Sequence, residues 1–155
     1  MRRITPDVQA LVQAAISDKG PAGFILKAWE RGDVGFVLCE QIIADYVGVL
    51  HRPRILRKFP HLTDDAIAAS AAALRQNAAI VVISEMPPIV TDDPDDNIVL
   101  ACAAEGGAEY VVTRDNHLLR LGTHHGIPII STEAFAGILR GQVSEPLEFV
   151  YGRRA

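Results

Sequence analysis

Short apolar runs typical of β-strands alternate with helical segments along most of the chain, and this alternation constrains the fold more than any other feature. Strands are predicted at residues 2–5, 35–39, 80–83, 109–113 and 127–130. Helices are predicted between and after them, at residues 7–16, 21–32, 40–50, 63–75, 97–105 and 132–140. Strands separated by helices are typical of a parallel sheet that helices cover on both faces. The continuous apolar character of residues 35–39, 110–112 and 127–130 agrees, because central parallel strands are buried on both sides.

Length and composition are those of one globular domain. The 155 residues predict a single domain, with a core over about residues 3–140 and a C-terminal tail over residues 141–155. Hydrophobic residues make up 49 % of the chain and charged residues 22 %, which excludes a disordered protein. No apolar stretch has the roughly 18 residues of a membrane span, and Asp7 interrupts what would be the apolar part of a signal peptide. We therefore expect a cytoplasmic protein with no membrane partner.

The two cysteines do not indicate a disulfide or a thiolate metal site. Cys39 and Cys102 each lie in an apolar context, and their spacing matches no CxxC motif. Free cysteines are among the most buried residue types, so both thiols are predicted to belong to the core.

Four aspartates stand where the predicted fold would bring them together: Asp7, Asp45, Asp96 and Asp115. Asp7 and Asp115 follow predicted strands, and open α/β sheets bind ligands at the carboxyl ends of their strands. Asp45 falls on the apolar stripe of the helix at 40–50, where a buried carboxylate is costly unless it meets a cation, a donor or a metal. Asp96 adjoins the apolar face of the helix that follows the acidic stretch TDDPDDNIV, residues 91–99.

Each of these acids also has a purely structural interpretation, which the residues alone leave open. Asp7 suits a helix N-cap, Asp115 a turn, and Asp45 the solvated edge of an apolar face. The stretch 91–99 suits a helix start, since Pro94 and negative charge both favour a first helical turn. The four acids within this stretch are nevertheless more than the capping of one helix requires.

Acids gathered at one sheet edge favour a particular chemistry. They would repel one another unless a hard cation neutralised them, and Mg²⁺ and Mn²⁺ prefer oxygen ligands together with a substrate phosphate. Such ions activate water and stabilise the charge that develops in phosphodiester hydrolysis. The sequence has no P-loop lysine motif, no GxGxxG, no GxSxG and no HExxH. Metal chemistry supported by acids alone is therefore the remaining prediction.

Basic and polar residues add candidates for substrate binding. The net charge of −4 argues against simple attraction to nucleic acid, but residues 51–59, HRPRILRKF, form a basic cluster. Its cations could contact RNA phosphates without reading sequence, while a solvated helix end and loop is the alternative interpretation. These candidate phosphate-binding residues are Arg52, Arg54, Arg57 and Lys58. The adjacent His124 and His125 are most simply a surface turn, and residues 85–90 are predicted to form a loop.

Three segments of the sequence, taken in order, resemble PIN-domain proteins of the bacterial group described as toxin components of toxin–antitoxin systems. The segments are ITPDVQALVQAAIS, GPAGFILKAWERGDVGFVLCEQIIADYVGVLHRPRI and TDDPDDNIVLACAAEGGAEYVVTRDNHLL. The resemblance runs from about Arg3 to Leu139. It implies a three-layer α/β sandwich around a central five-stranded parallel sheet. It also implies a homodimer and an antitoxin protein as partner.

The resemblance implies a site and an activity as well. The four acids of the family fall on Asp7, Asp45, Asp96 and Asp115, which would bind Mg²⁺ or Mn²⁺ and cleave single-stranded RNA with a metal-activated water. Residues expected beside these acids are Thr113, Gln9, Asn97 and Asn116.

The sequence departs from the family pattern at four positions, one of which is Val8, where Thr is common. Gln9 replaces the usual Asn, Asp45 the usual Glu, and His117 a frequent second acid. Two alternatives to the ribonuclease therefore stay open. One is a catalytically degenerate module that binds RNA or a protein, and the other is a phosphatase-like site on another α/β fold.

Overall fold

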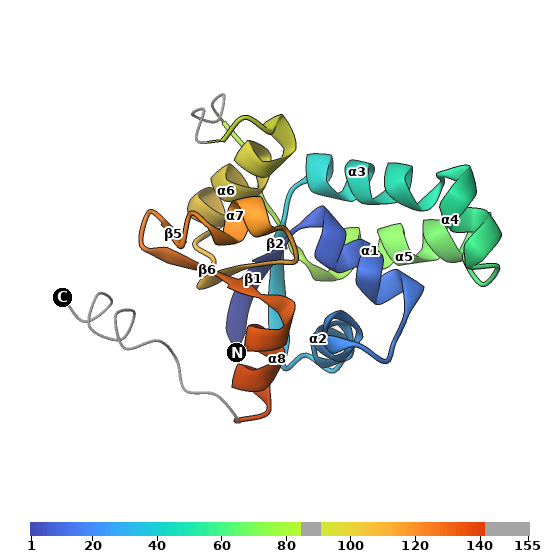
Figure 1. Ribbon diagram of the computed structural model, residues 1–155, viewed down its shortest axis with the longest axis horizontal. Helices are drawn as coiled ribbons and strands as arrows, with labels where there is room; N and C mark the ends of the chain where they lie inside the picture. Colours follow the sequence, from blue (N-terminus) through green and yellow to red (C-terminus); the bar gives the residue numbers. More distant parts are fainter. Residues whose placement is uncertain (85–90, 142–155) are drawn as a thin grey trace.

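The computed structural model describes residues 1–84 and 91–141, and within these residues one sheet of six strands forms the centre of the molecule (Figure 1). The strands are β1 (Arg2–Pro6), β2 (Val34–Leu38), β3 (Ala79–Ile80), β4 (Tyr110–Thr113), β5 (Thr123–His124) and β6 (Ile127–Ser131). Their order across the sheet is β3-β2-β1-β4-β6-β5. All neighbouring pairs are parallel except β5 and β6, which are antiparallel.

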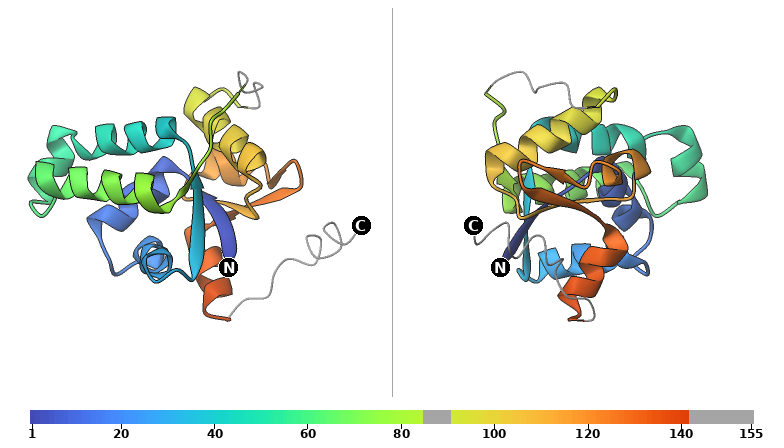
Figure 2. Two further views of the ribbon diagram at one scale, coloured as in Figure 1. Left: turned by 180° about the vertical axis from the view of Figure 1, so that it is seen from behind. Right: turned by 60° about the vertical axis from the view of Figure 1, so that its left-hand side comes forward.

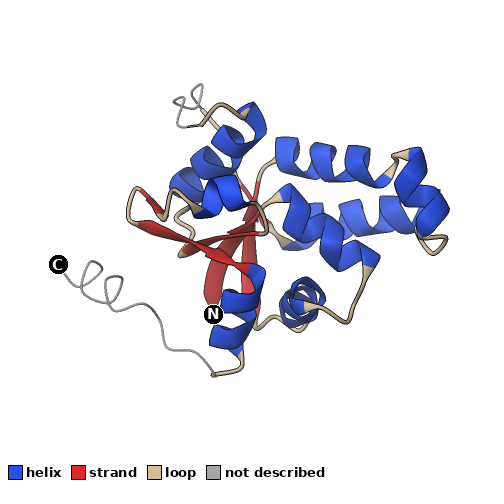
Figure 3. Cartoon of the chain, viewed as in Figure 1, coloured by secondary structure: helices blue, strands red, loops and turns tan. Residues whose placement is uncertain are grey.

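Helices cover both faces of this sheet. They are α1 (Val8–Ile16), α2 (Pro21–Glu30), α3 (Glu40–Leu50), α4 (Pro53–Lys58), α5 (Asp64–Asn77), α6 (Pro94–Gly106), α7 (Asn116–Leu119) and α8 (Thr132–Leu139). Helices α2 and α8 lie on one face and α6 on the other (Figure 2, right). Helices α3, α4 and α5 form an arm that extends away from the sheet (Figures 1 and 3). The predicted three-layer α/β sandwich is confirmed, with one strand more than the five that the resemblance implied.

The sixth strand and a short helix correct two of the predictions. His124 belongs to β5, so the predicted surface turn at the two histidines is wrong in part; His125, with a φ of 50°, and Gly126 make the turn that leads into β6. The basic cluster is not a loop but helix α4. Pro53 ends α3 as predicted and then occupies the first turn of α4, where the missing N–H of proline costs nothing.

The edge strand β3 is shorter than predicted. The predicted strand at residues 80–83 is reduced to Ala79–Ile80, with one further backbone bond from the Val81 N–H to the Leu38 carbonyl at 2.7 Å. Beyond this point the chain leaves the sheet, and the Val82 side chain is 82 % exposed. The predicted loop at residues 85–90 and the tail from residue 142 onward lie outside the described residues.

The core confirms the predictions drawn from apolar patterning. All four residues of β4 are buried, as a central parallel strand requires. Cys39 and Cys102 are fully buried free thiols, and the Cys102 thiol donates to the Val37 carbonyl at 3.8 Å. No helix among residues 1–84 and 91–141 combines the length and the apolar character that a membrane crossing needs.

The close approach of α6 to the sheet depends on Gly106. A Cβ atom at this position would overlap the Val37 side chain and would lie 2.7 Å from Val81 Cγ2. The change Gly106→Ala is therefore expected to lower the free energy of unfolding by about 1–3 kcal/mol through overpacking. The control Gly48→Ala, in α3 with nothing within 4 Å of the added Cβ, is expected to raise it by about 0.5–1 kcal/mol. Urea denaturation of both variants measures the two effects, and equal stabilities would contradict the close approach.

Strand register brings the ends of β1 and β4 together. Pro6 is paired with Val112, and the Asp7 N–H then donates to the Val112 carbonyl at 3.0 Å. Asp7 and Asp115 therefore leave adjacent strands at the same edge of the sheet. The first turn of α6 also reaches this edge, because the helix runs back along the sheet before β4 begins.

Candidate functional site

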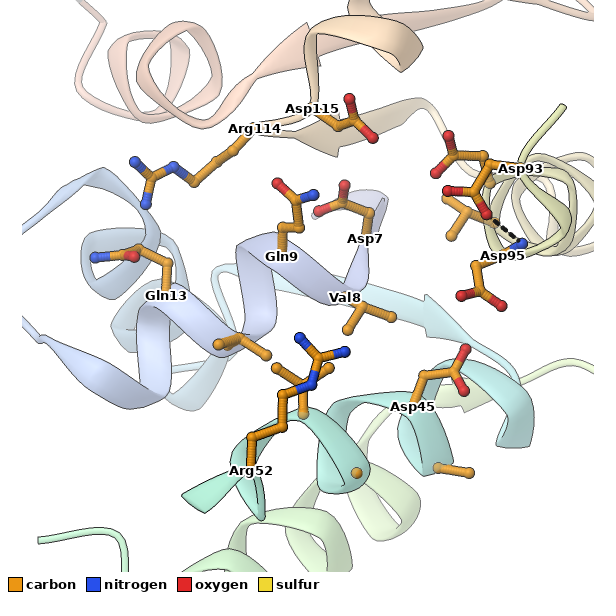
Figure 4. A pocket seen from close by; sticks show the side chains of 16 residues that line it. Asp7, Val8, Gln9, Gln13, Asp45, Arg52, Asp93, Asp95, Arg114 and Asp115 are labelled. Carbon is orange, nitrogen blue, oxygen red and sulfur yellow. Dashed lines mark hydrogen bonds between the residues drawn. The ribbon is translucent and has the colours of Figure 1, made fainter. Parts of the chain in front are cut away.

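A pocket of about 650 Å³ opens at the carboxyl edge of the sheet, between the start of α1, the start of α6, the middle of α3 and the loop after β4 (Figure 4). Carboxylates dominate its lining: Asp7, Asp45, Asp93, Asp95, Asp96 and Asp115. All four aspartates singled out in the sequence line this one pocket. The structure therefore brings all four to one pocket, and their chemical roles stay a prediction.

Asp7 is the most deeply buried of these acids, with an exposed fraction of 3 %. It caps α1, since its Oδ1 accepts from the Ala10 N–H at 2.8 Å, as its structural interpretation required. Its other oxygen accepts a hydrogen bond from the Thr113 hydroxyl. Burial raises the pKa of Asp7 from 3.8 to about 6; the two hydrogen bonds oppose this shift, and the negative charge of Asp115 adds to it.

Thr113 connects Asp7 to Asp115. Its hydroxyl oxygen donates to Asp7 and accepts from the Asp115 N–H at 2.8 Å. Asp115 in turn caps the short helix α7, because its Oδ1 accepts from the His117 N–H at 2.8 Å. Thr113 is fully buried, so this connection fixes the ends of β1 and β4 relative to each other.

Asp96 faces Asp7 and Asp115 from α6. It is 8 % exposed, and burial is the main cause that raises its pKa from 3.8 to about 6. The charges of Asp93, Asp115 and Asp7 raise it further, in that order. Capping of α6 falls instead to Asp93, whose Oδ1 accepts from the Asp95 N–H at 2.9 Å. The Asp96 carboxylate is thus directed into the pocket rather than used as the helix cap.

Asp45 lines the same pocket but has different neighbours. Burial raises its pKa, and the charge of Asp95 and a hydrogen bond with that side chain raise it further. In Figure 4, Asp45 lies on the side of Asp95, apart from Asp7 and Asp115. Besides Asp93, which caps α6, the acidic wall has two parts: an inner trio of Asp7, Asp96 and Asp115, and an outer pair of Asp45 and Asp95.

The residues predicted beside the acids have separate fates. Gln9 lines the pocket. Asn97 is buried behind it, where its side chain binds both the N–H and the carbonyl of Thr91 at 2.9 and 3.0 Å and so holds the turn before α6. Asn116 is exposed at the start of α7 and is not part of the pocket lining.

The basic cluster divides at its first arginine. Arg52 lines the pocket, whereas the other three cations are exposed along α4 and are not part of its lining: Arg54, Arg57 and Lys58. The structure also brings Arg114 and Gln13 to the pocket, which sequence reasoning missed. Gln13 lies four residues after Gln9 on α1, a spacing that could have revealed it.

The donor set suits a hard divalent cation. Carboxylate oxygens that repel one another, in a half-enclosed pocket that raises two of their pKa values to about 6, would be relieved by Mg²⁺ or Mn²⁺. Within residues 1–84 and 91–141, no three acidic, histidine or cysteine side chains are close enough for a ready-made protein cage. Mg²⁺ commonly retains water and binds through one or two carboxylates together with substrate phosphate, so the residues present fit such an ion.

A family model described as PIN domain matches residues 3–117, which include Asp7, Asp45, Asp96 and Asp115. Neither the curated proteins nor the solved structures gave a match.

Proposed function

Because the chain belongs to the PIN-domain family, whose members are generally nucleases, we propose that it is a ribonuclease that uses Mg²⁺ or Mn²⁺ to hydrolyse single-stranded RNA. The observation that carries this proposal is the inner trio of Asp7, Asp96 and Asp115, which line one open pocket from three separate segments of the chain. A divalent ion held there would supply the Lewis acid that activates water and offsets charge on the phosphodiester.

The protein's own residues would orient this chemistry. Thr113 holds Asp7 and the start of the Asp115 loop in a fixed relation, so the two carboxylates keep their spacing when the site is loaded. The outer pair, Asp45 and Asp95, would provide a further carboxylate oxygen or would bind a water at the mouth of the pocket. The toxin role, the antitoxin partner and the homodimer remain predictions that rest on the resemblance.

The activity is tested by metal dependence. Purified protein should cleave a labelled single-stranded RNA in the presence of Mg²⁺ or Mn²⁺, and excess chelator should abolish the cleavage. Readdition of the metal should restore it, because the ion lowers the pKa of its bound water and stabilises the charge that develops on the phosphodiester. Cleavage that persists in excess chelator would contradict the proposal. Hydrolysis of a small phosphomonoester without cleavage of RNA would favour the phosphatase-like alternative.

A further inference from the structure

The pocket has a second wall, formed by Gln9, Gln13 and Arg114, whose side chains are neutral or positively charged rather than acidic. Gln9 and Gln13 project from successive turns of α1, and Arg114 reaches the pocket from the loop after β4. In Figure 4 the guanidinium of Arg114 is directed away from Asp115, toward the side of the pocket where Gln13 lies. Arg52, at the C-cap end of α3, approaches from the opposite rim. Two cations thus flank the inner trio of acids.

Within residues 1–84 and 91–141, neither guanidinium is used in an ion pair. Among the described residues, Arg52 and Arg114 make no salt bridge within 4.0 Å, although six aspartates line the same pocket. Other arginines of the chain are paired: Arg31 with Asp33 at 3.0 Å and Arg75 with Glu40 at 2.6 Å. Both pocket arginines are exposed, and each guanidinium carries five N–H donors.

Planar guanidinium groups suit the oxygens of a phosphate, which they bind through two parallel hydrogen bonds. The inner trio can serve only the phosphate that reacts. Arg114 lies beside the trio but is directed away from it, and Arg52 enters the pocket from the opposite rim, so each is positioned for a phosphate next to the reacting one on the same strand. Such contacts fix the position of a strand without reading its bases.

We propose that Arg114, with Arg52 on the opposite rim, binds the phosphates that flank the scissile phosphate, so that the site is built for a polynucleotide strand. The inference rests on the proposed nuclease function and adds to it the binding residue Arg114 and a requirement for flanking phosphates. The glutamine amides of the same wall then lie where the sugar and base next to the cleaved bond would pass.

Substrate length provides the decisive comparison, since a dinucleotide has one phosphodiester and no flanking phosphate. The change Arg114→Gln is expected to lower kcat/KM for a single-stranded oligonucleotide about 10-fold or more, mainly through KM, and to lower kcat/KM for the dinucleotide by a much smaller factor. Arg114→Lys should recover part of the loss, because it keeps the charge but not the fork. The positive charge of Arg114 lowers the pKa of Asp7, so its removal would raise that pKa. The assays are therefore run at a pH well above the pKa of Asp7, where this carboxylate is ionised in every variant. Equal losses on both substrates would overturn the proposal.

Arg31→Gln is the matched control, because it removes the same charge from an exposed arginine outside the pocket. It should behave as wild type on both substrates. A loss on the oligonucleotide as large as that of Arg114→Gln would mean that overall charge, and not this wall, attracts the strand.

A binding measurement separates this inference from the proposed function. Anisotropy of a labelled single-stranded RNA in chelator, where no cleavage is expected, should show weaker binding for Arg114→Gln. Log affinity falls as log salt concentration rises, and the magnitude of this negative slope should be smaller by about 0.7 for each phosphate that the variant no longer binds. This result supports the wall even if the wild-type protein cleaves nothing. An unchanged slope and affinity would overturn the wall even if the nuclease is confirmed.

Discussion

Replacing Asp96 with asparagine is expected to lower metal-dependent RNA cleavage by at least about 100-fold, more than the loss of a group that only supports a ligand. Asp96 is the member of the inner trio that α6 contributes, and it faces both Asp7 and Asp115. Asparagine has nearly the same shape but no charge, so the fold is kept while one anionic oxygen ligand is lost. Initial rates with Mn²⁺ measure the loss of cleavage, and Mn²⁺ titration by calorimetry measures the loss of metal affinity.

The control for this experiment lies in the same acidic stretch. Asp92→Asn makes the same chemical change at an exposed position that is not part of the pocket lining, and its activity should equal that of wild type. Cleavage by Asp96→Asn at the wild-type rate would refute the assignment of Asp96. Equal losses in both variants would show that the general charge of the stretch matters and the position does not.

The strand ends made half of the site predictable from the sequence. Asp7 and Asp115 follow apolar runs, and the parallel topology that those runs imply places both residues at one edge. Asp96 could be inferred because a helix before β4 must begin near that same edge. These inferences depend on backbone direction alone, which a pattern of apolar residues specifies well.

The other half depended on side-chain neighbours, which periodicity does not specify. Asp45 meets Asp95 rather than the inner trio, because α3 leaves the sheet as part of the arm while α6 lies across its face. The four cations of residues 52–58 looked equivalent in sequence, yet the turn between α3 and α4 leaves only Arg52 at the pocket. Sequence reasoning missed Arg114 because this residue, between Thr113 and Asp115, belongs to no basic cluster and to no periodic pattern.

Although Asp96→Asn is expected to lower RNA cleavage, it is expected to raise the stability of the metal-free protein. In the metal-free protein, Asp96→Asn should raise the free energy of unfolding by about 1–3 kcal/mol at neutral and higher pH. The pKa of Asp96 is about 6 in the folded protein against an ordinary value of 3.8, so the folded state holds this proton more tightly. Wild-type stability should therefore fall as the pH rises from about 4 to about 6, and Asp7 adds a fall over the same range. Below pH of about 4 the carboxyl is neutral in both states, and the advantage of asparagine should vanish.

Metal should reverse this order of stabilities. An ion that binds only the folded protein stabilises it by about 4.1 kcal/mol at a thousand times its Kd, which exceeds the advantage of asparagine, and the variant that lacks Asp96 forgoes most of that gain. Denaturation at several pH values, with chelator and then with Mn²⁺, measures both effects, and Asp92→Asn should follow wild type throughout. Wild type and Asp96→Asn that were equally stable in chelator at every pH would contradict the repulsion in the pocket. A variant that was more stable in chelator and was still stabilised fully by Mn²⁺ would show that the charges repel but that the ion binds elsewhere. The site would then store repulsion that no ligand at Asp96 relieves, and the nuclease assignment would lose its physical basis.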